Sequence, residues 1–118
     1  MFPSPRIVLV LALICVAATA PASRISPKEC SEGGDFIRNA ALARENGISK
    51  ASFIARLQDD IQTIQAFPRE LRWFVQDEDD AEFLIDAATE VFEMPLDPAA
   101  HGRKFMQECL ARKPGKRL

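Results

Sequence analysis

A dense run of carboxylates is the feature of the sequence best suited to bind a cation. The run reads Asp77-Glu78-Asp79-Asp80-Ala81-Glu82, and hard cations such as Ca²⁺ take clustered carboxylate ligands. The EF-hand loop does not fit, because its turn glycine would fall on Glu82 and its bidentate glutamate on Ala88. We therefore favour a helix N-terminus, whose dipole attracts negative charge, over a metal site, and we expect neither metal nor cofactor.

His101 is the single histidine of the chain, so it is the first residue to consider for acid–base chemistry. A hydrolytic site would also need a nucleophile and an orienting acid around it. Ser49 and Ser52 are explained as cap residues, and Thr63 and Thr89 fall inside expected helices. We expect a surface histidine and a protein that is not an enzyme.

Cys30 and Cys109 are the two cysteines that remain if Cys15 leaves with an N-terminal leader. An exported protein with an even number of cysteines usually oxidises them, and two cysteines allow one pairing. A redox-active pair is the alternative, but nothing resembles a Cys-x-x-Cys motif. The sequence predicts a structural disulfide between Cys30 and Cys109.

The best candidate for recognition is the segment 67–75, which reads Phe-Pro-Arg-Glu-Leu-Arg-Trp-Phe-Val. On a helix, Phe67, Leu71, Phe74 and Val75 share one side, whereas Trp73 lies off that stripe with Arg69 and Arg72 nearby. Trp and Arg often dominate interface energetics, so Arg69, Arg72 and Trp73 are the candidate protein-contact surface. The favoured alternative is that Trp73 packs at the edge of the bundle.

Charge is unevenly distributed along the chain. Nine acidic and no basic side chains lie between Asp77 and Asp97, whereas 103–118 hold six basic and one acidic side chain. We favour two helix faces that attract each other over a docking surface for a basic partner. The formal net charge of −2 argues against a nucleic-acid partner.

Helical signals position these residues, and strand signals are nearly absent. An alanine-rich helix over 35–46 ends at Gly47, while Gly33 and Gly34 leave its start open. Ser49 caps the next helix, which presents Phe53, Ile54, Leu57, Ile61 and Ile64 at helical spacing.

Three further helices follow. Pro68 opens a short helix through Val75, and Asp77 caps a helix that stops at Met94-Pro95. Asp97-Pro98 starts the last helix, which Pro114-Gly115 ends. The expected fold is a small, closed, all-α bundle of four main helices and one short helix, with one disulfide joining its two ends.

The N-terminus has the pattern of an export signal. Arg6 precedes an apolar run from Ile7 to Ala18, which is too short to span a bilayer. Ala20-Pro21-Ala22 offers a cleavage site before Ser23. We expect a cleavable signal peptide (1–22), a helical domain (23–113) and a flexible basic tail (114–118), with no membrane span in the mature chain.

The order of these elements resembles small exported single-disulfide helical proteins of Gram-negative bacteria that have no assigned function. The resemblance rests on Cys30, on Arg44-Glu45-Asn46-Gly47 closing the alanine-rich helix, on Pro95 to Pro98 and on Cys109. In outline the chain is also similar to periplasmic acid-stress chaperones and to periplasmic immunity proteins. The resemblance implies a periplasmic or secreted location.

These observations together predict a non-enzymatic, exported protein-interaction module whose partner is another envelope protein. The alternatives are a stress chaperone or an immunity-type inhibitor of an envelope-targeting toxin, and, last, a small hydrolase or ligand carrier. A surface patch around Trp73 favours partner binding, whereas a deep pocket ringed by titratable groups favours an enzyme.

Overall fold

Four α-helices and one short 3₁₀-helix make up the protein, of which a computed structural model describes residues 26–112. In chain order they are α1 (Pro27–Glu45), α2 (Lys50–Gln65), η2 (Arg69–Leu71), α3 (Glu78–Glu93) and α4 (Pro98–Leu110). No strand occurs within this range. The predicted all-α fold is confirmed. The predicted leader (1–22) and basic tail (114–118) lie outside the described residues.

Helix α1 begins earlier than the sequence pattern suggested. The Ser26 hydroxyl accepts a hydrogen bond from the backbone N–H of Glu29 at 3.2 Å, and the Glu29 carboxylate accepts one from the backbone N–H of Ser26 at 3.0 Å. This capping box, followed by Pro27, fixes the start. The start, which the sequence left open, is thus Pro27, and Gly33 and Gly34 lie inside the helix despite their low helix propensity.

Local hydrogen bonds set the end of α1 and the starts of α2, α3 and α4 as expected. Gly47, with φ of +93°, follows α1, and the backbone N–H of Ile48 donates back to the carbonyl of Ala43 at 3.0 Å. The side chains of Ser49, Asp77 and Asp97 each accept a hydrogen bond from the backbone N–H three residues later. Helix α4 ends at Leu110, before the predicted end at Pro114-Gly115.

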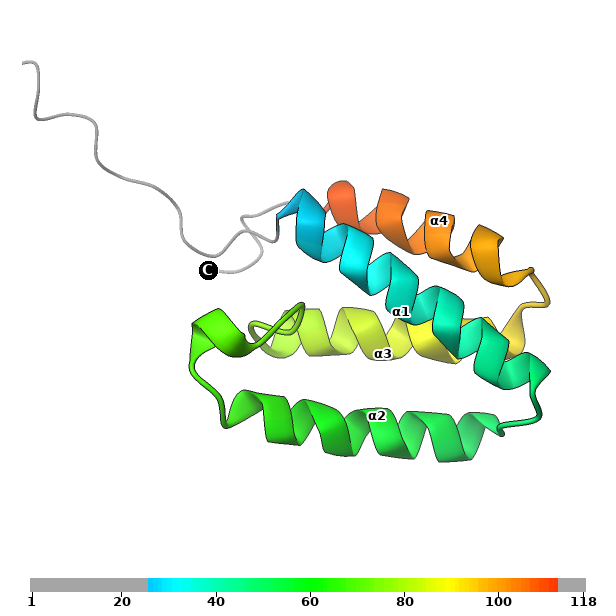
Figure 1. Ribbon diagram of the computed structural model, residues 1–118, viewed down its shortest axis with the longest axis horizontal. Coiled ribbons are helices and arrows are strands. Elements are labelled where there is room, and N and C mark those ends of the chain that lie inside the picture. The colour runs from blue at the N-terminus through cyan, green and yellow to red at the C-terminus, as the bar shows by residue number, and fades with distance from the viewer. Residues whose placement is uncertain (1–25, 113–118) are drawn as a thin grey trace, which may run out of the picture.

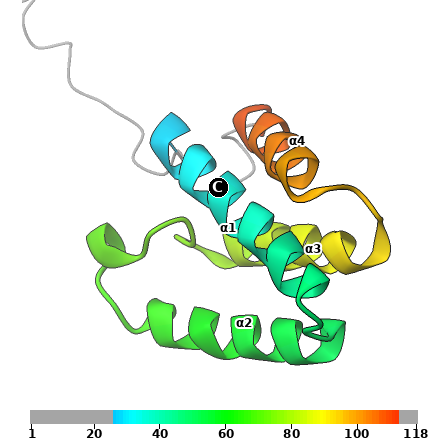
Figure 2. The same ribbon diagram turned by 45° about the vertical axis from the view of Figure 1, so that its right-hand side comes forward.

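The helices form one bundle in which α1 lies along α4 and α3 contacts both α1 and α2 (Figure 1). Figure 2, a view turned by 45°, shows the same order, with α2 farthest from α4. Within residues 26–112, no helix is long and apolar enough to cross a membrane.

Glycines allow α1 and α4 to approach closely. A Cβ atom built on Gly34 would lie 3.1 Å from the carbonyl oxygen of Gly102, and one built on Gly102 would lie 3.1 Å from that of Gly34. A Cβ atom on Gly33 would overlap the ring of Phe105. These positions need glycine because the backbones and the ring occupy the space of a side chain.

A connected set of aromatic rings runs through the core. Neighbouring rings have centroids 5.1–6.2 Å apart, a range in which aromatic pairs attract each other. Every α-helix and the α2–α3 connection contribute to it. Its members are Phe36, Phe53, Trp73, Phe74, Phe83, Phe92 and Phe105.

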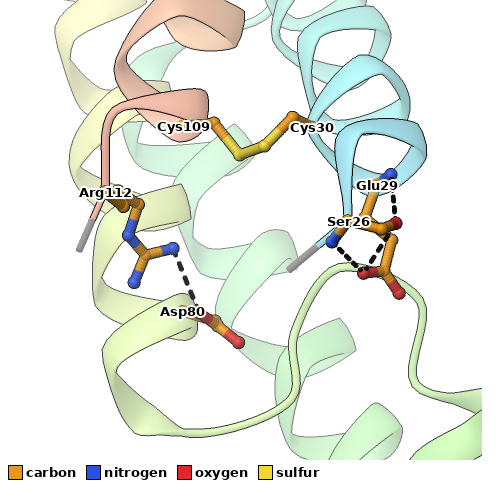
Figure 3. Close-up of a disulfide and its surroundings, with 6 residues drawn as sticks. All are labelled: Ser26, Glu29, Cys30, Asp80, Cys109 and Arg112. Carbon is orange, nitrogen blue, oxygen red and sulfur yellow. Dashed lines mark hydrogen bonds and ion pairs between the residues drawn. A yellow bond between two sulfur atoms is a disulfide. The ribbon is translucent and has the colours of Figure 1, made fainter. Parts of the chain in front are cut away.

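The predicted disulfide is present. Cys30, in the first turn of α1, is bonded to Cys109, in the last turn of α4, with 5.6 Å between their Cα atoms (Figure 3). Both residues are buried. The bond joins the start of the first helix to the end of the last, as expected. Closing a loop of 79 residues stabilises the fold by about 4.5 kcal/mol in the chain-entropy model.

Ion pairs join the acidic helix α3 to the basic segment that begins at Arg103 in α4 and continues past its end. Lys104 Nζ lies 2.7 Å from Glu90 Oε1, and Arg112 Nη1 lies 3.0 Å from Asp80 Oδ1. The pair to Glu90 is the main cause that raises the pKa of Lys104 above its ordinary value. The interpretation that the two charged segments attract each other is therefore supported by direct contacts.

Candidate functional site

The segment predicted to carry recognition is the connection between α2 and α3, residues 66–77. It was expected to continue as a short helix from Pro68 to Val75, and that expectation is wrong. Only Arg69–Leu71 form a 3₁₀ turn, after which Trp73 adopts a φ of +54°. A positive φ cannot belong to a right-handed helix, so the chain turns at Trp73 and the predicted helical stripe does not form.

Arg72 holds this connection together. Its Nε donates to the carbonyl of Phe67 at 2.8 Å, its Nη1 to that of Gln76 at 3.1 Å and its Nη2 to that of Gln65 at 3.0 Å. One planar guanidinium thus bridges the end of α2 and the residues before α3. Its position assigns Arg72 an internal, stabilising role. A direct contact of Arg72 with a partner stays a prediction.

Trp73 is half-buried and packs on the bundle. Its ring lies edge-on to Phe36, with 5.6 Å between centroids, and 5.9 Å from Phe74. Its carbonyl accepts a hydrogen bond from Gln76 Nε2 at 3.0 Å. The position agrees with the favoured interpretation, in which Trp73 covers an edge of the bundle. Its role in partner contact remains a prediction.

The exposed apolar side chains of the connection are Phe67 and Leu71, which are 43% and 65% exposed. The sequence pattern had placed both on a buried stripe with Phe74 and Val75, of which only the last two are buried. Arg69 is exposed too, and within residues 26–112 its side chain makes no hydrogen bond or ion pair. Phe67 precedes Pro68, and a residue before proline disfavours the helical conformation, which was a sequence signal that Phe67 does not share a helix with Leu71.

The carboxylate run 77–82 forms the N-terminus of α3, as favoured. Asp77 caps the helix, and its Oδ1 accepts from the backbone N–H of Asp80 at 2.9 Å. Asp80 itself is fully buried, which the sequence did not indicate. Its carboxylate binds Arg112 (Figure 3) and also accepts a hydrogen bond from the backbone N–H of Gln76. Within the described residues, no three His, Cys, Asp or Glu side chains are placed to hold a metal ion together.

His101 is not on the surface, so that expectation is wrong. It is 2% exposed, and its Nε2 lies 3.0 Å from the carbonyl oxygen of Met94. Arg44 donates to the same carbonyl at 3.2 Å and to those of Val91 and Leu96. His101 and Arg44 therefore satisfy backbone carbonyls where α3 turns into α4, in the way Arg72 does between α2 and α3.

The structure thus brings Arg69, Arg72 and Trp73 into one connection but gives them different roles. Arg69 reaches solvent, Arg72 binds the backbone and Trp73 lies between core and surface.

Comparison with protein-family models, with curated proteins and with solved structures found no match to this chain.

Proposed function

We propose that the protein is a non-enzymatic, exported interaction module that binds another envelope protein through the α2–α3 connection. The observation that carries this proposal is the exposure of Phe67 and Leu71 on a connection that Arg72 holds in place. Single exposed apolar residues are common on protein surfaces. Here two of them flank a solvent-exposed arginine on a pre-organised backbone, which lowers the entropic cost of binding.

The proposed contact surface is defined by Phe67, Arg69 and Leu71, with the exposed part of Trp73 beside them. Phe67 and Leu71 would fill apolar hollows of the partner, and Arg69 would face a carboxylate or an aromatic ring. Arg72 would act indirectly by holding the connection. This division of roles distinguishes residues that matter for binding from residues that matter for folding.

Four polar groups that the sequence offered for catalysis make other bonds, which supports the non-enzymatic proposal. The hydroxyls of Thr63 and Thr89 donate to backbone carbonyls of their own helices, and the Ser49 hydroxyl caps α2. His101 is buried against Met94. The proposal of export rests on the leader pattern, and the buried disulfide is compatible with an oxidising compartment. Cell fractionation and N-terminal sequencing test it, with Ser23 as the expected first residue.

The experiment for the contact surface compares two double variants of the oxidised mature protein. Phe67→Ser with Leu71→Ser removes the proposed anchors, whereas Leu42→Ser with Leu110→Ser removes two exposed leucines elsewhere, 39% and 53% exposed. An envelope protein captured by wild type is identified and its affinity measured. The first variant should lose about 2 kcal/mol or more of binding and the control little. Equal binding by both variants would contradict the proposed surface.

A further inference from the structure

The last turn of α4 is attached to the bundle through the disulfide. In the stretch 107–111, Cys109 is the single buried residue and the other four are exposed. Helix ends with few buried contacts open locally at a low cost in free energy. The bond to Cys30 in α1 is therefore the covalent restraint that holds this turn, and Arg112 after it, in place (Figure 3).

Arg112 joins this turn to the α2–α3 connection through one carboxylate. Its Nη1 lies 3.0 Å from Oδ1 of the buried Asp80, and Oδ2 of Asp80 accepts a hydrogen bond from the backbone N–H of Gln76 at 3.0 Å. Burial of a carboxylate is costly when its cation is removed, so displacement of Arg112 would favour movement of Asp80 toward water. That movement would take Oδ2 away from Gln76.

Gln76 is bonded in turn to both residues that shape the connection. Its carbonyl accepts from Nη1 of Arg72 at 3.1 Å, and its Nε2 donates to the carbonyl of Trp73 at 3.0 Å. Arg72 also donates to the carbonyl of Phe67, which belongs to the proposed contact surface. A continuous series of contacts thus runs from the disulfide through the ion pair to that surface, and such networks can carry energetic coupling.

We infer that oxidation of Cys30 and Cys109 sets the contact surface in its binding conformation through Arg112 and Asp80, so that the protein binds its partner in the oxidised form. The inference rests on the proposed function, because it names the regulation of the same surface. Bond formation removes two electrons and two protons from the two thiols, and a disulfide-bearing oxidoreductase takes them up as it becomes a dithiol. Before oxidation, the connection is loose and the chain binds weakly.

Trp73 makes the inference testable, because it is the single tryptophan of the chain and lies in the connection. Quenching of its emission by acrylamide reports how closely the connection packs, whereas far-UV circular dichroism reports whether the helices persist. The oxidised mature chain is compared with Cys30→Ala plus Cys109→Ala under conditions in which both are folded. The variant should show stronger quenching and bind the captured envelope protein about tenfold more weakly.

Two further variants, both with the disulfide intact, trace the route. Arg112→Met removes only the ion pair, so it should strengthen Trp73 quenching and weaken binding as the cysteine variant does. It also decides the question if the cysteine variant does not fold. Arg44→Met is the matched control, because it removes an arginine that holds backbone carbonyls at the end of α3 away from the connection. It should change both readouts little.

Unchanged Trp73 quenching in the cysteine variant and in Arg112→Met would overturn the inference, since the connection would keep its packing without the bond or the ion pair. An effect of the cysteine variant alone would also overturn it, because Arg112 would not transmit the change. Equal effects in Arg44→Met would reflect a general loss of stability, with the same consequence. Unchanged partner affinity in both loosened variants would overturn it too.

The proposed function can fail separately, because Trp73 quenching is measured without a partner. A connection that loosens in both variants supports the coupling even if the oxidised wild type binds no envelope protein. That result would defeat the proposed function alone.

Discussion

Arg112, which follows α4, places its Nη1 atom 3.0 Å from Oδ1 of Asp80, a fully buried carboxylate in the first turn of α3. The same carboxylate accepts a hydrogen bond from the backbone N–H of Gln76 at 3.0 Å. The guanidinium also lies 4.5 Å from the centroid of the Phe83 ring. The pair therefore joins α3, α4 and the end of the α2–α3 connection beside the disulfide.

Replacement of Arg112 by methionine should lower the free energy of unfolding by about 2–3 kcal/mol, because a charge-assisted hydrogen bond to a buried carboxylate is lost. Lys104→Met is the control, since its pair with Glu90 is about one-third exposed on both sides, and should cost less than about 1 kcal/mol. Denaturant titration of both variants measures the difference. Equal losses of stability in Arg112→Met and Lys104→Met would contradict the expectation that the pair with the buried Asp80 stabilises the fold more than the exposed pair does.

Removal of the disulfide by Cys30→Ala with Cys109→Ala should cost about 2–5 kcal/mol. The bond closes most of the described chain into a loop. Its loss therefore mainly raises the conformational entropy of the unfolded state. Denaturant titration of the double variant against the oxidised wild type gives the value. Mass spectrometry after alkylation should find no free thiol in the oxidised mature protein, and two modified thiols would contradict the bond.

Gly33→Ala should destabilise the protein by about 1–3 kcal/mol, although alanine favours an isolated helix by about 1 kcal/mol. The added Cβ would overlap the Phe105 ring, and that ring cannot move away easily because it is buried between Phe74 and Phe83. Thermal melts measure the change. Gly47→Ala makes a useful comparison, because nothing lies within 4 Å of its added Cβ and its cost would come from the φ of +93° alone.

Trp73→Ala should cost about 3 kcal/mol of stability, since its ring packs on Phe36 and Phe74. Trp73→Gly should cost about 1 kcal/mol less than Trp73→Ala. Both variants lose the ring, but glycine tolerates the φ of +54°. Tryptophan emission of the native protein should be blue-shifted and turn red on unfolding. A red emission in the native state, with unchanged stability of Trp73→Ala, would identify Trp73 as an exposed anchor.

The pair between Lys104 and Glu90 should make stability depend on alkaline pH. Folding raises the pKa of Lys104, so the stabilisation is fully present below the unfolded value of 10.5 and is lost as pH rises through the folded value. Melting temperatures of wild type should fall in this alkaline window more than those of Lys104→Met. Parallel curves for the two proteins would contradict a role for Lys104.

Features that depend on neighbouring residues were predictable from the sequence. The caps at Ser49, Asp77 and Asp97 use hydrogen bonds that span three residues, so residue type and position suffice to find them. The disulfide was predicted by elimination, because only Cys30 and Cys109 lie outside the predicted leader. The starts of α2, α3 and α4 and the overall fold class came from the same short-range rules.

Features that depend on the meeting of distant segments were not predictable. Which carboxylate of the run 77–82 is buried depends on where Arg112 arrives from the end of α4. The burial of His101 depends on a carbonyl that becomes available as α3 ends at Met94. For the candidate site, a helical pattern placed Phe67 and Leu71 on the same side as the buried Phe74 and Val75, because no periodicity rule anticipates a tryptophan with a φ of +54°.

The disulfide also determines how the bundle would respond to mechanical force. Because Cys30 and Cys109 lie close to the two ends of the described chain and only 5.6 Å apart at their Cα atoms, tension applied through those ends would pass through the sulfur–sulfur bond. The segment between the cysteines, which holds nearly all of the four-helix bundle, would carry almost no load. A pulled molecule would extend only by its outer residues while oxidised, and reduction would transfer the load to the glycine-mediated contact of α1 with α4.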